Sequence, residues 1–415
     1  MKLKLAFLAA LAALALSAGM AQAQSATPGV SKNEIVLGTI LDQSGPLASN
    51  GKQFRMGLQL RVDEANEMGG VHGRKIKLLV EDDNYDPKKS VLATQKLIGQ
   101  GNGIFAVIGR MGTAMNNASM PVQFEKNVIN FLPYAAARSM SEPPHPLKWA
   151  NQPSQYDQAR VAAPRLMKQN NLSKACILYQ DDDFGAEVLQ GAEAGLKTIG
   201  KEFVEKTSYK RGATDFSTQV AKMKSAGCEL VVLGTIVRET VGAIVEARKA
   251  GFNPLFVGSS AVYNEQVIKL GGKPVEGLYA AMTAAHPYLD AAEQPVRSWA
   301  RKYQTKYNED PTVNSASGWG AMDAFLKVAF KVGPNLTTDA FVKTMETMTF
   351  PPDMFGMAEL TFSPTKHLGN QFSRLSQIQD GRWKVVSDYV AFSGLKSVKD
   401  KDGKLVVQSE FFKDR

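Results

Sequence analysis

The chain has 415 residues, of which 44% are hydrophobic and 21% are charged, and its 49 lysine and arginine residues against 40 acidic residues give a formal net charge of +9. The charge is spread along the chain without a run of five like charges, which argues against a nucleic-acid-binding protein, since such proteins concentrate positive charge in a stripe or tail. A chain of this length usually divides into two domains.

The N-terminus has the pattern of a secretory signal peptide. Lys2 and Lys4 precede an apolar run over residues 5–20, and the small-x-small triplet Ala21, Gln22 and Ala23 follows. This pattern predicts a cleaved signal peptide at 1–23, because the apolar run is too short for a membrane-spanning helix and ends in a cleavage site. No cysteine stands at the cleavage point, so we expect a freely soluble periplasmic protein without a lipid anchor.

The first part of the mature chain alternates apolar, β-branched strands with amphipathic helices. Four strands are predicted, at residues 35–41, 76–81, 104–109 and 128–133. In the first helix, Phe54, Leu58, Val62 and Ala65 recur on one face. Nearly continuous hydrophobic strands joined by helices predict a parallel sheet that is covered on both faces.

A second series of the same kind begins after the proline-rich stretch 143–146. Its strands are predicted at residues 175–180, 203–209, 229–234, 255–259 and 277–282. The sequence therefore predicts an α/β protein with two lobes, each built on its own sheet.

The remaining chain is not needed for two sequential domains. Three helices are expected at 296–308, 315–332 and 338–347, then a strand at 358–362, then a hairpin of strands 374–379 and 383–386 that turns at Asp380 and Gly381. These additions suggest interleaved lobes, with crossings near Asn151, Thr283 and Phe355 that together form a hinge. We predict a first lobe of 30–150 and 284–355, a second of 151–283 and 356–390, and a C-terminal extension at 391–415.

Two cysteines, Cys176 and Cys228, each lie at the start of a predicted strand. Two are too few for a fold built on disulfides. An oxidising periplasm allows them to pair if their strands are neighbours, and two buried free thiols are the alternative. The sequence leaves both open.

The motifs of common enzymes are absent. The histidines are scattered, without His-x-x-x-His spacing, and we expect each of them in a loop or at the surface. There is no Gly-x-Ser-x-Gly elbow, phosphate loop or strand-linked Gly-x-Gly-x-x-Gly motif. The acidic clusters 81–83 and 181–183 follow strands and can hold a metal, contact a ligand or the other lobe, or cap helices, the last being the interpretation we favour. We therefore expect no catalytic residue, no metal and no cofactor.

Several segments resemble a known family in order and spacing. They are Gly-Thr-Ile-Leu-Asp-Gln-Ser-Gly-Pro from Gly38, Asp-Asp-Asn-Tyr-Asp-Pro-Lys from Asp82, Val-Ile-Gly-Arg from Val107, Tyr-Gln-Asp-Asp-Asp-Phe-Gly from Tyr179, Asp-Phe-Ser from Asp215, Gly-Thr from Gly234 and Gly-Leu-Tyr from Gly277. Together they resemble the type I periplasmic solute-binding proteins typified by the Leu/Ile/Val receptors, over most of 33–390. The resemblance implies two Rossmann-like lobes joined by three crossovers, a ligand in the cleft between them, and delivery to the permease subunits of an ABC importer, a role in which a monomer suffices.

The resemblance also points to ligand-binding positions in the first lobe. Thr113 occupies the place of the hydroxyl residue that holds the ligand carboxylate in the amino-acid receptors, at the start of a helix whose free N–H groups also suit an anion. The alternative for Thr113 is an ordinary helix N-cap. At the family's second hydroxyl position stands Ala136, so one carboxylate contact is missing.

In the second lobe the departures concern the ammonium group. Ser259 and Ser260 stand where the family has Pro and Glu, and Ile236 replaces a tyrosine. A buried ammonium without a counter-charge costs several kcal/mol. We therefore expect a ligand that is not an ordinary α-amino acid.

The other candidate contacts are aromatic or basic: Tyr134, Tyr156, Phe184 and Tyr263, with Arg110 and Arg138 as anion partners. Such a set suits an aromatic carboxylate, because rings stack and arginine binds carboxylates through two hydrogen bonds. Each aromatic residue can equally belong to the core, and each arginine can serve packing or a salt bridge. The segments from Tyr209 and Gly234 resemble the branch that takes up aromatic compounds. A receptor for branched-chain amino acids or amides, and a sensory protein that docks to a signalling partner, are the alternatives.

Overall fold

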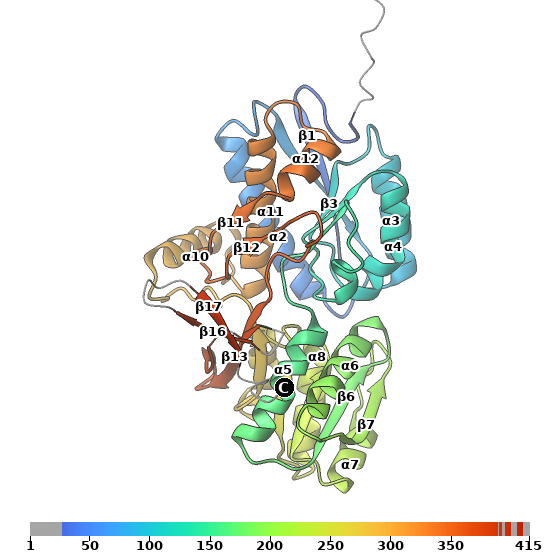
Figure 1. Cartoon of the computed structure of the whole chain (residues 1–415), viewed down its shortest axis with the longest axis vertical. Coiled ribbons are helices and arrows are strands. Elements are labelled where there is room, and N and C mark those ends of the chain that lie inside the picture. The colour runs from blue at the N-terminus through green and yellow to red at the C-terminus, as the bar shows by residue number, and fades with distance from the viewer. Residues whose placement is uncertain (1–26, 389, 392–394, 400–404, 410–415) are drawn as a thin grey trace, which may run out of the picture.

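The computed structural model describes residues 27–388, 390–391, 395–399 and 405–409. The predicted signal peptide at 1–23 lies outside the described residues. Two lobes lie one above the other, with the chain passing several times between them (Figure 1). Within the described residues, no helix combines the length and apolar character needed to cross a bilayer.

The first lobe contains a five-stranded parallel sheet in the order β2-β1-β3-β4-β5. Its strands are β1 (Glu34–Leu41), β2 (Lys75–Asp82), β3 (Ala106–Ile108), β4 (Ile129–Phe131) and β5 (Lys148–Trp149). The helices of this lobe from the first half of the chain are α2 (Ala48–Glu67), α3 (Pro87–Gly99) and α4 (Thr113–Glu125), with the short 3-10 helix η1 (Arg138–Met140). The face of α2 that the sequence predicts to be apolar is buried.

Three later helices complete this lobe: α10 (Gln294–Tyr307), α11 (Val313–Val332) and α12 (Thr338–Met345). In Figure 1 the orange α11 lies beside the blue α2, although more than two hundred residues separate them. Their backbones approach closely because Gly318 has no side chain: a Cβ there would lie 2.2 Å from the carbonyl oxygen of Phe54. The pair β11 (Thr349–Phe350) and β12 (Leu360–Thr361) follows.

The second lobe is built on a larger, mixed sheet. Its parallel part runs β10-β9-β8-β6-β7, and the antiparallel strand β13 adds next to β10. The bounds are β6 (Ala175–Gln180), β7 (Phe203–Tyr209), β8 (Leu230–Gly234), β9 (Leu255–Gly258), β10 (Tyr279–Met282), β13 (Phe372–Gln379) and β14 (Arg382–Val385). The helices are α5 (Gln155–Gln169), α6 (Asp183–Lys197), α7 (Ser217–Ser225), α8 (Val237–Lys249), α9 (Glu265–Gly271) and the 3-10 helix η2 (Lys273–Val275).

The C-terminal extension contributes three antiparallel strands that continue the second sheet beyond β13: β15 (Val390–Ala391), β16 (Leu395–Lys399) and β17 (Leu405–Ser409). The hairpin of β13 and β14 turns at Asp380 and Gly381, as predicted, and both residues have positive φ, as a two-residue hairpin of type I′ requires.

Three connections join the lobes. The first leads from β5 to α5, the second from β10 to α10, and the third from β12 to β13. The third follows later than the expected crossing near Phe355, because the chain is still held on the first lobe at His367, whose ring stacks on Trp149 at 4.0 Å. Ala150 also forms a bridge with Leu368. The third crossing therefore lies after Leu368 and not near Phe355, and the predicted boundaries of the two lobes stay a proposal.

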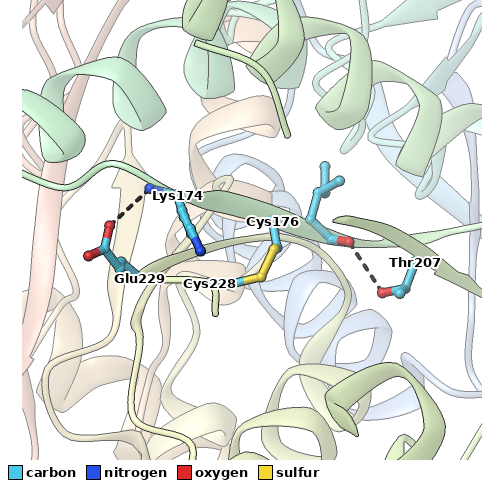
Figure 2. Close-up of a disulfide and its surroundings, with 6 residues drawn as sticks. Lys174, Cys176, Thr207, Cys228 and Glu229 are labelled. Atoms are coloured by element: carbon cyan, nitrogen blue, oxygen red, sulfur yellow. Dashed lines mark hydrogen bonds between the residues drawn. A yellow bond between two sulfur atoms is a disulfide. The ribbon is translucent and has the colours of Figure 1, made fainter. Parts of the chain in front are cut away.

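Cys176 and Cys228 form a disulfide, which decides between the two alternatives that the sequence leaves open. Cys176 lies at the start of β6 and Cys228 just before β8, the neighbouring strand, with Cα atoms 5.8 Å apart (Figure 2). Beside it, the backbone N–H of Lys174 donates to Glu229 at 2.9 Å, and the Thr207 hydroxyl donates to the carbonyl oxygen of Ile177 at 3.2 Å. The disulfide thus ties the end of the sheet where β6 and β8 begin.

Candidate ligand-binding cleft

A cavity with about 790 Å³ of empty space, part of it open to solvent, lies between the lobes. Thr113 and Tyr134 line it from the first lobe and Phe184 and Ser260 from the second, while Thr283 belongs to the second connection. In an α/β sheet the ligand crevice lies at the carboxyl ends of the parallel strands, and these residues all follow such ends.

Seven of the ten predicted contact residues line this cavity: Thr113, Tyr134, Ala136, Phe184, Ile236, Ser260 and Tyr263. Arg110, Tyr156 and Ser259 are not among the residues that line it. The structure therefore brings most of the set together, and their role in binding stays a prediction.

Arg110 is fully buried inside the first lobe. Its Nη2 donates to the Thr94 hydroxyl of α3 at 2.8 Å. Burial lowers the pKa of Arg110 to about 9, an effect that the charge of nearby Asp83 opposes, and burial raises the pKa of Asp83 to about 6. Of the two roles open to Arg110, its surroundings favour packing over ligand binding.

Tyr156 and Arg138 belong to the contact between the lobes. The Arg138 guanidinium lies 3.9 Å from the centre of the Tyr156 ring and 3.0 Å from the carboxylate of Glu187 on α6. Arg138 follows β4 in the first lobe, so this ion pair spans the lobes. The arginine is engaged there and does not line the cavity.

The two serines after β9 have different surroundings. The hydroxyl of buried Ser259 accepts from the N–H of Ala261 at 3.4 Å. The N–H of Ser260 donates to Gln158 at 2.7 Å, and its side chain lines the cavity. Ser260 is therefore the serine in a position to meet a ligand.

Thr113 is the first residue of α4, and the N-cap of this helix is Gly112. The alternative that Thr113 is itself the N-cap is therefore wrong. No side chain caps the helix, so its first N–H groups and its partial positive charge remain available at the cavity. Gly112 has φ of 87°, and a Cβ there would lie 2.0 Å from Met115 Cε and 2.9 Å from Tyr85 Cε2. Glycine is needed for this close approach.

Some residues in the lining were not anticipated. Tyr85, Gln155, Asn50, Thr283 and Ser317 line the cavity as well. Tyr85 lies within the family-like segment from Asp82, which could have suggested it. Gln155 begins α5 just after the first connection, and the oxygen of its buried side-chain amide has no hydrogen-bond partner among the described residues. It is a polar group free to bind a ligand.

None of the lining residues in the described part of the chain carries a charge. The cavity offers hydroxyl, amide and aromatic groups and the N-terminus of α4. Such a set can orient a polar ligand and hold an anion, but it has no carboxylate to pair with an ammonium group.

The cluster 181–183 caps a helix and contacts the other lobe, whereas the cluster 81–83 does not cap α3, whose N-cap is Asp86. Asp182 accepts from the N–H groups of Phe184 and Gly185 at the start of α6, as the favoured interpretation predicts. Asp183 accepts from the Asn117 side chain of the first lobe at 2.8 Å. Glu81 pairs with Lys96 at 2.8 Å. No group of three metal-ligating side chains is found within the residues that the structure describes.

The comparisons with known proteins agree with this architecture. A family model described as "Periplasmic binding protein" matches residues 34–382. The chain belongs to this family. The Leu/Ile/Val-binding protein of Escherichia coli (strain K12) is 27% identical over 265 residues, covering 62% of this chain and 72% of the relative. Members of the family bind small molecules for ABC transporters and are not enzymes, so the chain is a solute-binding protein of that kind, and the family implies a periplasmic location.

Two solved structures share the fold. The fatty acid ABC transporter substrate-binding protein from Thermomonospora curvata has a TM-score of 0.79 at 22% identity, covering 88% of this chain and 94% of that one. A solute-binding protein from R. palustris in complex with benzoate has a TM-score of 0.77 at 18% identity, covering 89% and 98%. These likenesses support the two-lobed α/β fold.

Proposed function

We propose that this protein is the receptor of an ABC importer for a small carboxylate, with an aromatic acid as the favoured ligand. The observation that carries the proposal is the absence of charge among the described residues that line the cleft. An α-amino acid would bring an ammonium group into this cavity, and a buried ammonium without a partner costs several kcal/mol. A carboxylate meets no such obstacle, since the start of α4 offers donors to it.

The lining also favours a ring. Tyr85, Tyr134, Phe184 and Tyr263 all line the cavity. Aromatic pairs contribute roughly 0.5–1.5 kcal/mol beyond the burial of their surface. A protein of the same fold from R. palustris holds benzoate, so the architecture is compatible with such a ligand.

Contacts from both lobes are needed for the ligand to close the cleft. A ligand shifts the equilibrium between open and closed forms only by its different affinity for the two. Thr113 belongs to the first lobe and Ser260 to the second, so a ligand that touches both stabilises the closed form. We propose that the closed form of a monomer, exported with the help of the segment at 1–23, docks on the permease.

Isothermal titration of the purified protein with benzoate, hydroxycinnamates, leucine and valine tests the ligand class. We expect the aromatic acids to bind and the amino acids not to. Tight, stereospecific binding of leucine with no binding of the aromatic acids would instead make this a branched-chain amino-acid receptor, as the name of the E. coli relative suggests.

Two variants test the site. We expect Thr113→Ala and Ser260→Ala each to weaken aromatic-acid binding by about three- to tenfold, in line with the roughly 0.5–1.5 kcal/mol of a hydrogen bond. The exposed Thr305→Ala on α10 and Ser225→Ala on α7 are matched controls that keep wild-type affinity. If neither site variant weakens binding, the placement of the contacts is wrong.

Co-purification with permease subunits, as opposed to a signalling protein, separates transport from sensing.

A further inference from the structure

A second cavity, with about 600 Å³ of empty space, part of it open to solvent, lies next to the cleft. Ser317 and Ala284 line both cavities, so the two spaces meet at these residues. Both side chains are small. The division between the cleft and the second cavity, which we call the hinge chamber, is therefore thin.

The hinge chamber lies between α11 on one side and the segment around β11 and β12 on the other. Asn151 of the first connection and Ala284 of the second also line it. Its wall is mostly apolar, with Phe350, Phe355 and Leu360 opposite the small residues of α11. A ligand entering it would meet hydrocarbon and aromatic surface.

The acidic groups in the wall already have partners. Asp353 accepts from the N–H groups of Phe355 and Met357, both at 2.9 Å. Asp323 pairs with Lys327 at 2.8 Å and with Arg61 at 2.9 Å. These carboxylates are satisfied within the fold and are not set to bind a polar ligand group.

Gly320 provides a second observation. Gly318, two residues earlier and on the opposite face of α11, must be glycine because of the close contact with α2. Among the described residues, the only atom within 4 Å of a Cβ built at Gly320 is Asp353 Oδ2, at 3.9 Å, so no packing contact requires glycine there. Glycine within a helix is unfavourable relative to alanine. What Gly320 provides is empty space in the chamber that it lines.

We infer that the hinge chamber is a subsite for the apolar tail of the ligand, so that the receptor selects carboxylates whose hydrocarbon portion reaches beyond Ser317. This inference rests on the proposed function, and it narrows the ligand class from small aromatic acids to elongated ones, such as phenylalkanoates. The carboxylate stays at the start of α4, the ring lies among the tyrosines of the cleft, and the chain enters the chamber.

The test is a homologous series of ligands: benzoate, phenylacetate, 3-phenylpropanoate and 5-phenylpentanoate, titrated into the wild-type protein, Gly320→Ala and Gly320→Leu. Each methylene that becomes buried raises affinity about fourfold, so the wild-type affinity rises along the series. Gly320→Leu fills the chamber and abolishes this rise while benzoate still binds with wild-type affinity. Gly320→Ala, which adds one methyl group beside Asp353, keeps most of the rise and is the matched control.

The outcomes separate the two proposals. If benzoate binds to the wild type but affinity stays flat or falls along the series, or if Gly320→Leu leaves the rise intact, the chamber is no subsite and the proposed function stands. If Gly320→Leu weakens benzoate as much as 5-phenylpentanoate, the inference is also wrong, since the substitution then acts on the fold. If no acid of the series binds, benzoate included, both proposals fail.

Discussion

Arg211 of the second lobe donates a hydrogen bond of 3.1 Å from Nη1 to the carbonyl oxygen of Tyr85 in the first lobe, and its guanidinium lies 5.2 Å from the centre of the Tyr85 ring. Its Nη2 is held by Asp182 at 2.7 Å, which orients the side chain. Because Tyr85 also lines the cleft, the contact between the lobes and the ligand site share a residue.

Arg211→Ala is expected to weaken ligand binding about tenfold. The contact with Tyr85 exists only when the lobes meet, so its loss destabilises the closed form relative to the open one. A hydrogen bond to a charged group contributes about 1.5–3 kcal/mol, and we take the lower part of that range because the side chain is 27% exposed. Isothermal titration measures the affinity, and small-angle X-ray scattering should show a more open unliganded protein.

Lys206→Ala is the control for this variant, because Lys206 forms an ion pair with Glu193 within the second lobe. It should leave affinity and shape unchanged. Arg211→Lys should behave nearly like Arg211→Ala, since a lysine cannot bridge Tyr85 and Asp182 with the planar fork of arginine. Wild-type affinity in Arg211→Ala would show that the contact does not help to close the lobes.

Removal of the disulfide should lower stability without changing binding. The link between Cys176 and Cys228 closes a loop with a sequence separation of 52, for which chain entropy predicts about 4 kcal/mol, an upper value. The variant Cys176→Ala/Cys228→Ala should therefore melt several degrees lower by calorimetry. Its ligand affinity should be unchanged, because the disulfide lies where β6 begins and the cleft lies where the strand ends. Adding a reductant to the wild type should lower its melting temperature. If the reductant lowers the melting temperature of the variant by the same amount, the reductant does not act through this disulfide.

The sheet could be predicted from the sequence because buried parallel strands are nearly continuous apolar runs. The predicted strands at 175–180 and 203–209 coincide with β6 and β7. The other predicted strands differ from the observed ones by one or two residues at an end, where pairing depends on the neighbouring strand. The third connection was placed too early, since no local pattern reveals that His367 stacks on Trp149.

The positions of the cleft residues were anticipated where they follow directly from a strand end or a family motif, as for Thr113 and Ser260. Arg110 could not be placed in this way. It stands in the same strand-end segment as Thr113, but its side chain turns inward to Thr94. Contacts between the lobes, such as that of Arg211 with Tyr85, join segments far apart in the chain and leave no periodic signal.

His286 should make the protein less stable in mild acid. It is buried beside Tyr288, and burial, together with the charges of Lys269 and Arg382, lowers its pKa to about 3 from the usual 6.5. The unfolded chain therefore binds a proton that the folded protein does not over the range from pH 6.5 to about 3, and stability falls as pH falls through that range. At pH 5 the expected loss is about 2 kcal/mol relative to pH 8.

The measurement is thermal unfolding between pH 8 and pH 4 for the wild type and His286→Gln, which cannot take up the proton. The variant should show a flatter dependence between pH 6.5 and 4. The Glu265 Oε1 atom lies 3.2 Å from His286 Nδ1, and burial raises the pKa of Glu265. The raised pKa favours the folded state at low pH, so Glu265 opposes the effect of His286 on stability. His72→Gln at the surface is the control, and an identical slope in the wild type and His286→Gln would exclude His286 as the cause.

Ser260→Glu places a carboxylate in the cleft at the position where the resemblance to the amino-acid receptors implies one. If the natural ligand is a carboxylate without an ammonium group, like charges then face each other in a partly dehydrated site, and affinity for the aromatic acid should fall at least tenfold, or about 1.4 kcal/mol. Ser260→Gln introduces a side chain of nearly the same size as glutamate but without the charge, and it should lose much less affinity for the aromatic acid. Isothermal titration of both variants at pH 7 and at low and moderate salt separates charge from size, because only the charge effect weakens with salt. Equal losses in the two variants would mean that Ser260 is simply crowded, whereas new binding of leucine by Ser260→Glu would show that this one carboxylate decides between an acid and an amino acid in the cleft.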